Sequence, residues 1–163
     1  MSSAQSGDFF EKARAIAASV LFACGAAAII GSLLDWVTVE AQPPDVPADQ
    51  LHRLPPFSGI EIGDGWVVIG AASLVLVCAF FIVIKGRSRY AWLAFLGCIV
   101  IGGISISDYR GIDELHLSLE AIGRGPRPGL GLTLVAAAGL IGLAASAAAV
   151  AASPSGSQSR STG

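Results

Sequence analysis

Side chains that could carry out chemistry are few in this chain and widely spaced. Its two histidines, His52 and His116, have no cysteine or second histidine near them at the spacing of a metal site. Three cysteines, Cys24, Cys78 and Cys98, each lie near the middle of an apolar stretch, where a thiol acts as a small packing group. No Gly-x-Ser-x-Gly motif, paired base or phosphate loop accompanies the serines. We therefore expect no enzyme activity, no metal site and no cofactor.

Two aspartates, Asp35 and Asp108, occupy equivalent positions just beyond two apolar stretches, and an aromatic residue follows each. They could form a paired acidic site, or each could end a helix and face water, which is the interpretation we adopt. The repeat of an apolar stretch, an Asp-aromatic pair and a loop closing on glycines suggests two duplicated hairpins. The alternative is that any chain with paired spans shows such a pattern.

The elements that must position these residues are four apolar stretches without a single charged residue. They cover residues 15–34, 66–84, 90–106 and 130–152. About 20 apolar residues in a helix cross the ~30 Å hydrocarbon core of a bilayer, so each stretch can span it. The expected fold class is an all-α membrane protein, a four-helix transmembrane bundle with a small β and loop cap on its outer side.

Composition agrees with a membrane protein. The chain is 53% hydrophobic and 13% charged, whereas soluble domains carry about 25% charged residues. Its 163 residues leave room for one membrane domain, residues 15–152, with a cytoplasmic N-terminus over 1–14 and a disordered cytoplasmic tail over 153–163. The net charge of −2 gives no reason to expect a nucleic-acid partner.

Orientation follows from the distribution of lysine and arginine. The short turn Lys85–Arg89 holds three basic residues and no acid, and Lys12 and Arg14 precede the first span. The segment 35–64 instead holds six acids and one arginine. Because basic residues accumulate on the cytoplasmic side, we expect a multi-pass plasma-membrane protein with both termini cytoplasmic.

The two outer loops differ in pattern. Trp36–Glu40 and Phe57–Ile62 alternate apolar and polar residues, which predicts two short strands that pair across the proline-rich stretch 42–56. In the second loop, apolar residues from Ile112 to Ile122 recur at helical spacing beside acids, which predicts a short amphipathic helix on the membrane surface or over the bundle.

Small residues at helical spacing predict where the helices pack, because close backbone approach holds helices together in lipid. The second span is instead bulky, with Phe80 and Phe81, and is expected to face lipid or a partner. The predicted packing residues are Ser19, Ala23, Ala27, Gly31, Ala94, Cys98 and Gly102.

The first half of the chain resembles small four-span membrane proteins that are common in actinobacteria. The resemblance rests on Leu34–Val39, on Ser58-Gly59-Ile60 and on Gly63–Trp66 at the start of the second span. A more distant resemblance is to claudin-like proteins with a β-rich first outer loop, although the cysteine pair of that loop is missing here. The resemblance implies a fold and no catalytic residue.

Two functions follow as hypotheses. The first is a non-enzymatic accessory or scaffold subunit that lies in the lipid bilayer and binds other membrane proteins of the cell envelope. The second is a homo-oligomeric pore or a lipid-handling protein, although the spans lack the ionisable groups of pumps and coupled transporters. Loop residues that four short helices cannot all bury form the expected interaction surface. They are Trp36, Leu51, Leu54, Phe57, Ile60, Ile112 and Leu115.

Overall fold

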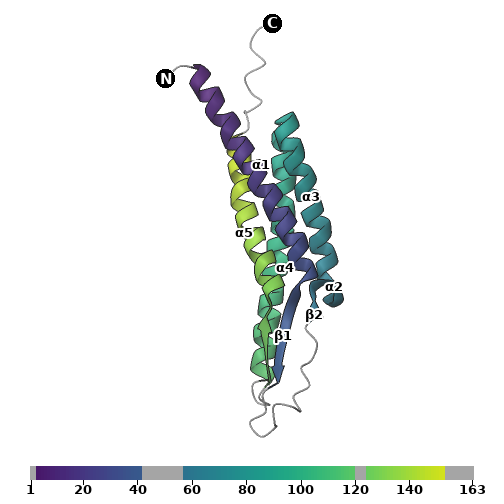
Figure 1. Ribbon diagram of the computed structural model, residues 1–163. Helices are drawn as coiled ribbons and strands as arrows, with labels where there is room; N and C mark the ends of the chain where they lie inside the picture. The colour runs from purple at the N-terminus through teal and green to yellow at the C-terminus, as the bar shows by residue number, and fades with distance from the viewer. Residues whose placement is uncertain (1–2, 42–56, 120–123, 153–163) are drawn as a thin grey trace.

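The structure, a computed structural model, describes residues 3–41, 57–119 and 124–152 (Figure 1). Its long helices run alternately up and down, and each packs against the next around the bundle, with the last returning to the first. The start of the first helix, the turn between the third and fourth, and the end of the fifth share one end of the bundle. The strands lie at the other end. In chain order the elements are α1 (Ser3–Leu33), β1 (Asp35–Ala41), β2 (Phe57–Ser58), α2 (Gly59–Ile62), α3 (Asp64–Lys85), α4 (Ser88–Leu119), β3 (Arg124–Pro128) and α5 (Leu130–Ala151).

Within the described residues, four helices are long and apolar enough to cross a membrane, as expected for a multi-pass membrane protein. Their apolar windows cover 9–33, 64–85, 88–112 and 130–151. The predicted spans differ most at α4, which continues as one helix to Leu119. Residues 112–119 are helical as predicted, but they continue α4 instead of forming a short helix of their own, because a charged residue ends an apolar run without ending a helix.

Glycines and a capping box define the short connections. Gly86, with φ 59°, ends α3 in the left-handed conformation, and its N–H donates to the Ile82 carbonyl at 3.1 Å. Ser58 and Glu61 form a reciprocal capping box, in which the Ser58 N–H donates to Glu61 Oε2 at 2.9 Å. This box starts the turn α2, so the strand predicted over Phe57–Ile62 is wrong beyond Ser58.

A three-stranded antiparallel sheet, in the order β2-β1-β3, follows the end of α1. Its longer pairing joins β1 to β3, from Val37 opposite Pro128 to Ala41 opposite Arg124. The pairing of β1 with β2 is short and irregular. Proline cannot donate a ladder hydrogen bond, so Pro126 and Pro128 are tolerated because β3 is an edge strand. The first loop therefore pairs mainly with the second.

Helix packing uses small residues, but not all of those predicted. Ala94, Cys98, Gly102 and Gly31 are buried, and Ala27 is half-buried. Ser19 and Ala23 are exposed, which corrects their predicted role. Residues four apart are rotated by about 40° around a helix. A row of such residues that is buried at Gly31 therefore turns away from the neighbouring helices by Ala23 and Ser19. The buried face of α1 instead includes Ala17, Ala18, Leu21, Cys24, Gly25 and Ala28.

The helices approach most closely at paired glycines. A Cβ on Gly131 would lie 2.5 Å from the Gly31 carbonyl oxygen, which brings α5 against α1 backbone to backbone. A Cβ on Gly139 would lie 2.9 Å from the Gly102 nitrogen, which does the same for α5 and α4. These contacts leave no room for a side chain at Gly31, Gly131 and Gly139. They fix the start of α5 beside the end of α1, where β1 begins.

Some sequence predictions concern residues outside the described ranges. These are the tail over 153–163, the proline-rich stretch 42–56, and the interaction residues Leu51 and Leu54.

Candidate functional site

The predicted interaction residues do not form one exposed surface. Trp36 is 1% exposed and Ile112 is 7% exposed, so both belong to the core, contrary to the expectation that they would be left uncovered. Ile60 is half-buried in α2, whereas Phe57 belongs to β2 and Leu115 to α4. The physical reason is that β1 carries Trp36 across the ends of the helices, and the extension of α4 covers the same region.

The indole of Trp36 is held from two sides. Its Nε1–H donates to the Gly31 carbonyl at 2.9 Å, at the last turn of α1. Gly59 packs so closely on the ring that a Cβ there would clash with indole atom Cε2. The Trp36 carbonyl accepts from the Gly129 N–H at 2.7 Å, just before α5. One residue therefore connects α1, α2 and α5, and a tryptophan whose N–H is satisfied can be fully buried.

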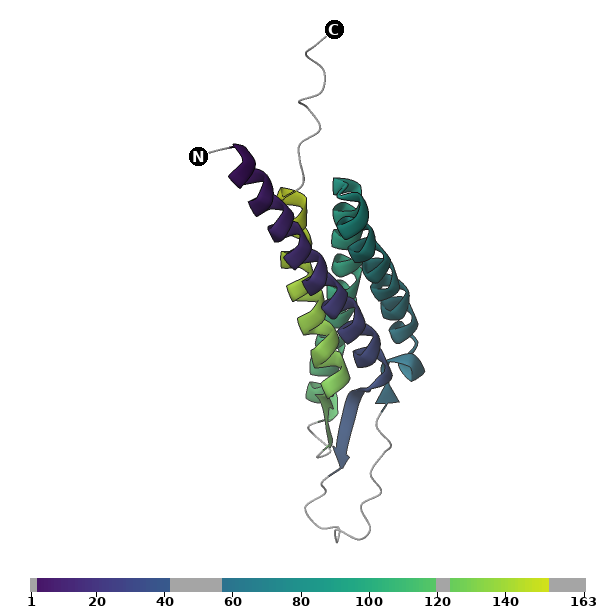
Figure 2. The same ribbon diagram turned by 45° about the horizontal axis from the view of Figure 1, so that its top comes forward.

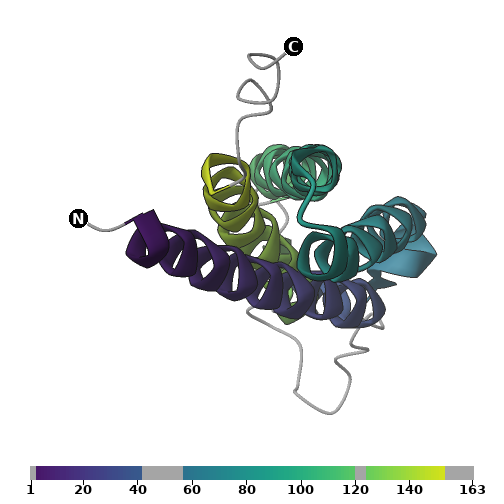
Figure 3. The same ribbon diagram turned by 90° about the horizontal axis from the view of Figure 1, so that it is seen from above.

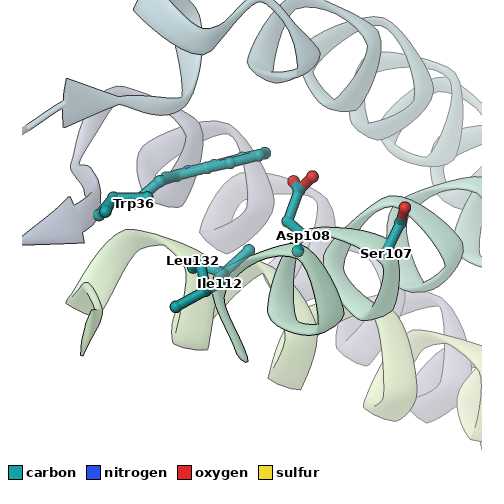
Figure 4. A pocket seen from close by; sticks show the side chains of 7 residues that line it. Trp36, Ser107, Asp108, Ile112 and Leu132 are labelled. Atoms are coloured by element: carbon teal, nitrogen blue, oxygen red, sulfur yellow. The ribbon is translucent and has the colours of Figure 1, made fainter. Parts of the chain in front are cut away.

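Beside this tryptophan is a cavity of about 330 Å³. Figure 4 shows the Asp108 carboxylate rising from α4 toward the end of the indole, with the Ser107 hydroxyl on the same side. The cavity lies where β1, α4 and the start of α5 meet. Its lining residues are Trp36, Val37, Ser107, Asp108, Gly111, Ile112 and Leu132.

Asp108 is the unusual group in this cavity. It is half-buried, and its atom Oδ2 is buried without any hydrogen-bond partner. The carboxyl of Asp64, at the start of α3, acts on Asp108 electrostatically, and its like charge is repulsive. A buried polar group left unsatisfied costs about 1–3 kcal/mol, and more when charged. Our expectation that the helix-end aspartates face water therefore holds for the exposed Asp35 but not for Asp108.

A pair of hydroxyls fixes α4 to α5 next to the cavity. Tyr109 Oη and Thr133 Oγ1 are 3.0 Å apart, and Thr133 Oγ1 donates to the Gly129 carbonyl at 3.1 Å. Because the single hydroxyl proton of Thr133 is directed to Gly129, Tyr109 is the donor to Thr133. The turn of α4 that carries Asp108 is therefore held against α5.

A second hollow lies near the other end of the bundle, between α1 and α5. Figure 2 and Figure 3 show α1 running obliquely to α5, so that the two helices separate toward the start of α1. The resulting groove has a volume of about 630 Å³ and is almost wholly apolar. Half of its lining residues are alanines; the full set is Phe9, Lys12, Ala13, Ile16, Ala17, Val20, Ile141, Ala144, Ala145 and Ala148.

Basic residues gather at this same end. The guanidinium of Arg14 lies against Gly86 in the turn between α3 and α4. Lys85 Nζ lies 5.0 Å from the centre of the Phe81 ring, and Phe81 stacks on Tyr90 with ring centres 5.1 Å apart. Phe81 is therefore half-buried, and of the two neighbouring phenylalanines it is Phe80 that is exposed. The cation–π contact and the stacking hold the basic turn to the bundle.

Sequence reasoning missed most residues of both hollows. Ser107, Gly111 and Leu132 carry no motif, and they meet only because α4 stays helical beyond its apolar run. Among the described residues, no group of three or more His, Cys, Asp or Glu side chains could hold a metal ion. In the cavity a serine and an aspartate without a histidine do not form a nucleophile-base pair.

Comparison with protein-family models and with curated proteins found no match to this chain.

Proposed function

We propose that the chain is a non-enzymatic plasma-membrane protein, an accessory or scaffold subunit that binds other membrane proteins of the cell envelope. The observation that carries this proposal is the apolar groove between α1 and α5. Both helices are long and apolar enough to span a membrane, so in this proposal the part of the groove beyond residue 14 faces the bilayer. A transmembrane helix of a partner protein is the proposed occupant.

The composition of the groove favours a helix over a fluid acyl chain. Ala144, Ala145 and Ala148 line it from α5, and Ala13 and Ala17 line it from α1. Alanines let a third backbone approach closely, which is how helices associate where lipid removes the hydrophobic driving force. The groove extends along α1 from Phe9 to Val20, about 16 Å at 1.5 Å per residue, or three helical turns.

The proposed orientation places both ends of the chain in the cytoplasm and the sheet on the outer side. It is supported by the acid-free basic turn Lys85–Arg89, which shares one end of the bundle with the start of α1 and the end of α5. The test is labelling of intact cells with an impermeant thiol reagent. Asp35→Cys should react and Ser88→Cys should not, and the described native cysteines are all buried. The reverse labelling pattern would overturn the orientation.

In-cell photo-crosslinking tests the groove. A photoreactive phenylalanine analogue is placed at Ala144, which lines the groove, or at Ala147, which is exposed on the same helix but does not line it. Position 144 should give a discrete adduct with one membrane protein, identified by mass spectrometry, and position 147 should not. Filling the groove with Ala148→Phe should reduce the adduct at least about tenfold, a loss of 1.4 kcal/mol or more. The matched change Ala137→Phe, at an exposed alanine elsewhere on α5, should leave it intact.

The other outcomes decide against the proposal. An adduct with a second copy of this chain would favour the homo-oligomer. Adducts with lipid alone at position 144 would favour a lipid-handling role. Equal adducts at both positions would mean that the groove is not an interface. Leu51 and Leu54 stay predicted contributors to partner binding from the first loop.

A further inference from the structure

We propose that the cavity between β1, α4 and α5 binds a primary organic ammonium group, with Asp108 as its acceptor. The inference stands on the cavity and on the carboxylate oxygen Oδ2, which is buried and has no hydrogen-bond partner. It concerns the strand end of the bundle and is independent of the groove between α1 and α5.

The charge in the cavity is unbalanced. Among the seven described residues that line it, Asp108 is the only ionisable one. Asp64, which acts on Asp108 electrostatically, is also an acid. Burial and the like charge of Asp64 both destabilise the Asp108 carboxylate, and a paired cation would relieve this. Because none of the described residues that line the cavity is cationic, we infer that the pairing cation is a ligand.

The donor set selects the kind of cation. Ca²⁺ takes six to eight oxygen ligands, whereas this cavity offers one carboxylate and the Ser107 hydroxyl. A quaternary ammonium carries no N–H and could not donate a hydrogen bond to the Asp108 carboxylate. A primary ammonium has three N–H donors, which suits a cavity lined by a carboxylate and a hydroxyl.

The walls of the cavity select the rest of the ligand. Val37, Ile112 and Leu132 are apolar, and the indole N–H of Trp36 is already donated to Gly31, so the ring offers only its carbon surface. A volume of about 330 Å³ is at the lower end of small-molecule pockets. The ligand therefore combines an ammonium group with a short apolar or aromatic body.

Two sources could supply this chemistry. One is a free organic amine, and the other is the ethanolamine headgroup of a phospholipid, because the cavity lies at the strand end of the membrane-spanning helices. Both present the same primary ammonium to Asp108.

Calorimetric titration of the full-length protein in detergent tests the proposal, with phenethylammonium as the probe and 2-phenylethanol as its neutral counterpart. Wild type should bind the amine with a Kd of about 1 mM or tighter, and bind the alcohol at least about tenfold more weakly. Asp108→Asn keeps the shape, removes the charge, and should weaken amine binding at least about tenfold. Asp35→Asn, at an exposed acid that does not line the cavity, is the control and should weaken it less than about threefold.

A steric variant keeps the test independent of the stability of the Asp108 variant. Gly111 lines the cavity, and a Cβ at this position meets nothing within 4 Å, so Gly111→Leu fills the cavity without a backbone clash. Gly103 is exposed on the same helix with equally open space, but it does not line the cavity. Gly111→Leu should abolish amine binding, and Gly103→Leu should preserve it.

Three results would overturn the site. They are equal binding of amine and alcohol, equal losses for the Asp35 and Asp108 variants, and no amine binding by wild type. Titration in phosphatidylcholine nanodiscs, with and without phosphatidylethanolamine, then identifies the source. If phosphatidylethanolamine competes with the probe in wild type, the headgroup is the ligand; if it does not compete, the ligand is a free amine.

Discussion

The two helix pairs of the bundle begin alike in sequence and diverge at the same point. In the first pair, α1 ends at Leu33 and Asp35-Trp36 starts the strand β1. In the second pair, Asp108-Tyr109 lies inside α4, which continues helical to Leu119. The same type of Asp-aromatic dipeptide therefore lies in different surroundings in the two pairs. Asp35 is exposed beside a buried Trp36, whereas Asp108 is recessed beside a half-buried Tyr109.

This divergence is what makes the cavity. The strand brings Trp36 back over the end of α1, and the uninterrupted helix supplies a wall that carries Asp108 and Ile112. Two identical hairpins would give either two strands or two long helices, and neither arrangement would place an indole opposite a carboxylate. If the halves arose by duplication, the difference between them is where a site was formed.

The tryptophan and the tyrosine at equivalent positions should differ most in their effect on stability. Trp36→Ala should lower the free energy of unfolding by about 3–5 kcal/mol, because it empties a fully buried position. Tyr109→Phe should cost about 1 kcal/mol, the value of its hydrogen bond to Thr133. A thiol-reactive fluorogenic dye can measure thermal unfolding in detergent, because the three free cysteines are buried.

Trp92→Ala is the control for this comparison, because Trp92 is 55% exposed on α4. It should change the unfolding temperature little in detergent. Equal losses for the two tryptophan variants would mean that Trp36 does not organise the strand end of the bundle.

Hydropathy was enough to predict the four helices, because an apolar stretch of the right length has few other solutions in a bilayer. It could not predict where α4 ends, since the residues beyond Ser107 leave the apolar run but stay helical. The turn α2 had a readable signal in Ser58 and Glu61, the two ends of a capping box, and the alternating pattern concealed it.

The site was harder to predict than the fold. Residues such as Gly111 and Leu132 are ordinary in sequence and become neighbours only through the register of α4 against α5. The strand β3 was also hidden, because Pro126 and Pro128 argue against a strand unless it is known to be an edge. Burial of Trp36 depends on Gly59, more than 20 residues away, and no local pattern reveals that contact.

The glycines at close helix contacts provide a second comparison of the two helix pairs, with Gly31 on α1 and Gly102 on α4. A Cβ on Gly31 would lie 2.8 Å from Val135 Cγ2 and 2.9 Å from the Gly131 carbonyl oxygen, so Gly31→Ala should destabilise by about 1–3 kcal/mol. A Cβ on Gly102 meets nothing within 4 Å, because only its backbone contacts Gly139. Gly102→Ala should therefore be neutral, or stabilising by about 0.5–1 kcal/mol through reduced chain entropy.

The thermal assay with the thiol dye checks this pair as well. Both glycines were predicted from sequence to pack in the same way, so equal destabilisation would restore that simpler interpretation. Gly139→Ala gives a third point and should resemble Gly31→Ala, since its Cβ would lie 2.9 Å from the Gly102 nitrogen.

The smallest effect is expected at the two aspartates, and its sign carries the information. Asp35→Asn should stay within about 0.5 kcal/mol of wild type, as for most exposed positions. Asp108→Asn should stabilise the unliganded protein by about 1–2 kcal/mol, because it removes a charge whose buried oxygen has no partner. A group that weakens the fold in this way is typical of a site kept for binding.

If Asp108→Asn instead destabilises by about 3–5 kcal/mol, the cost of breaking a buried ion pair, then Asp108 already has a cationic partner within the chain. That result would leave no charge for an ammonium ligand to neutralise, and the two aspartates would differ only in packing.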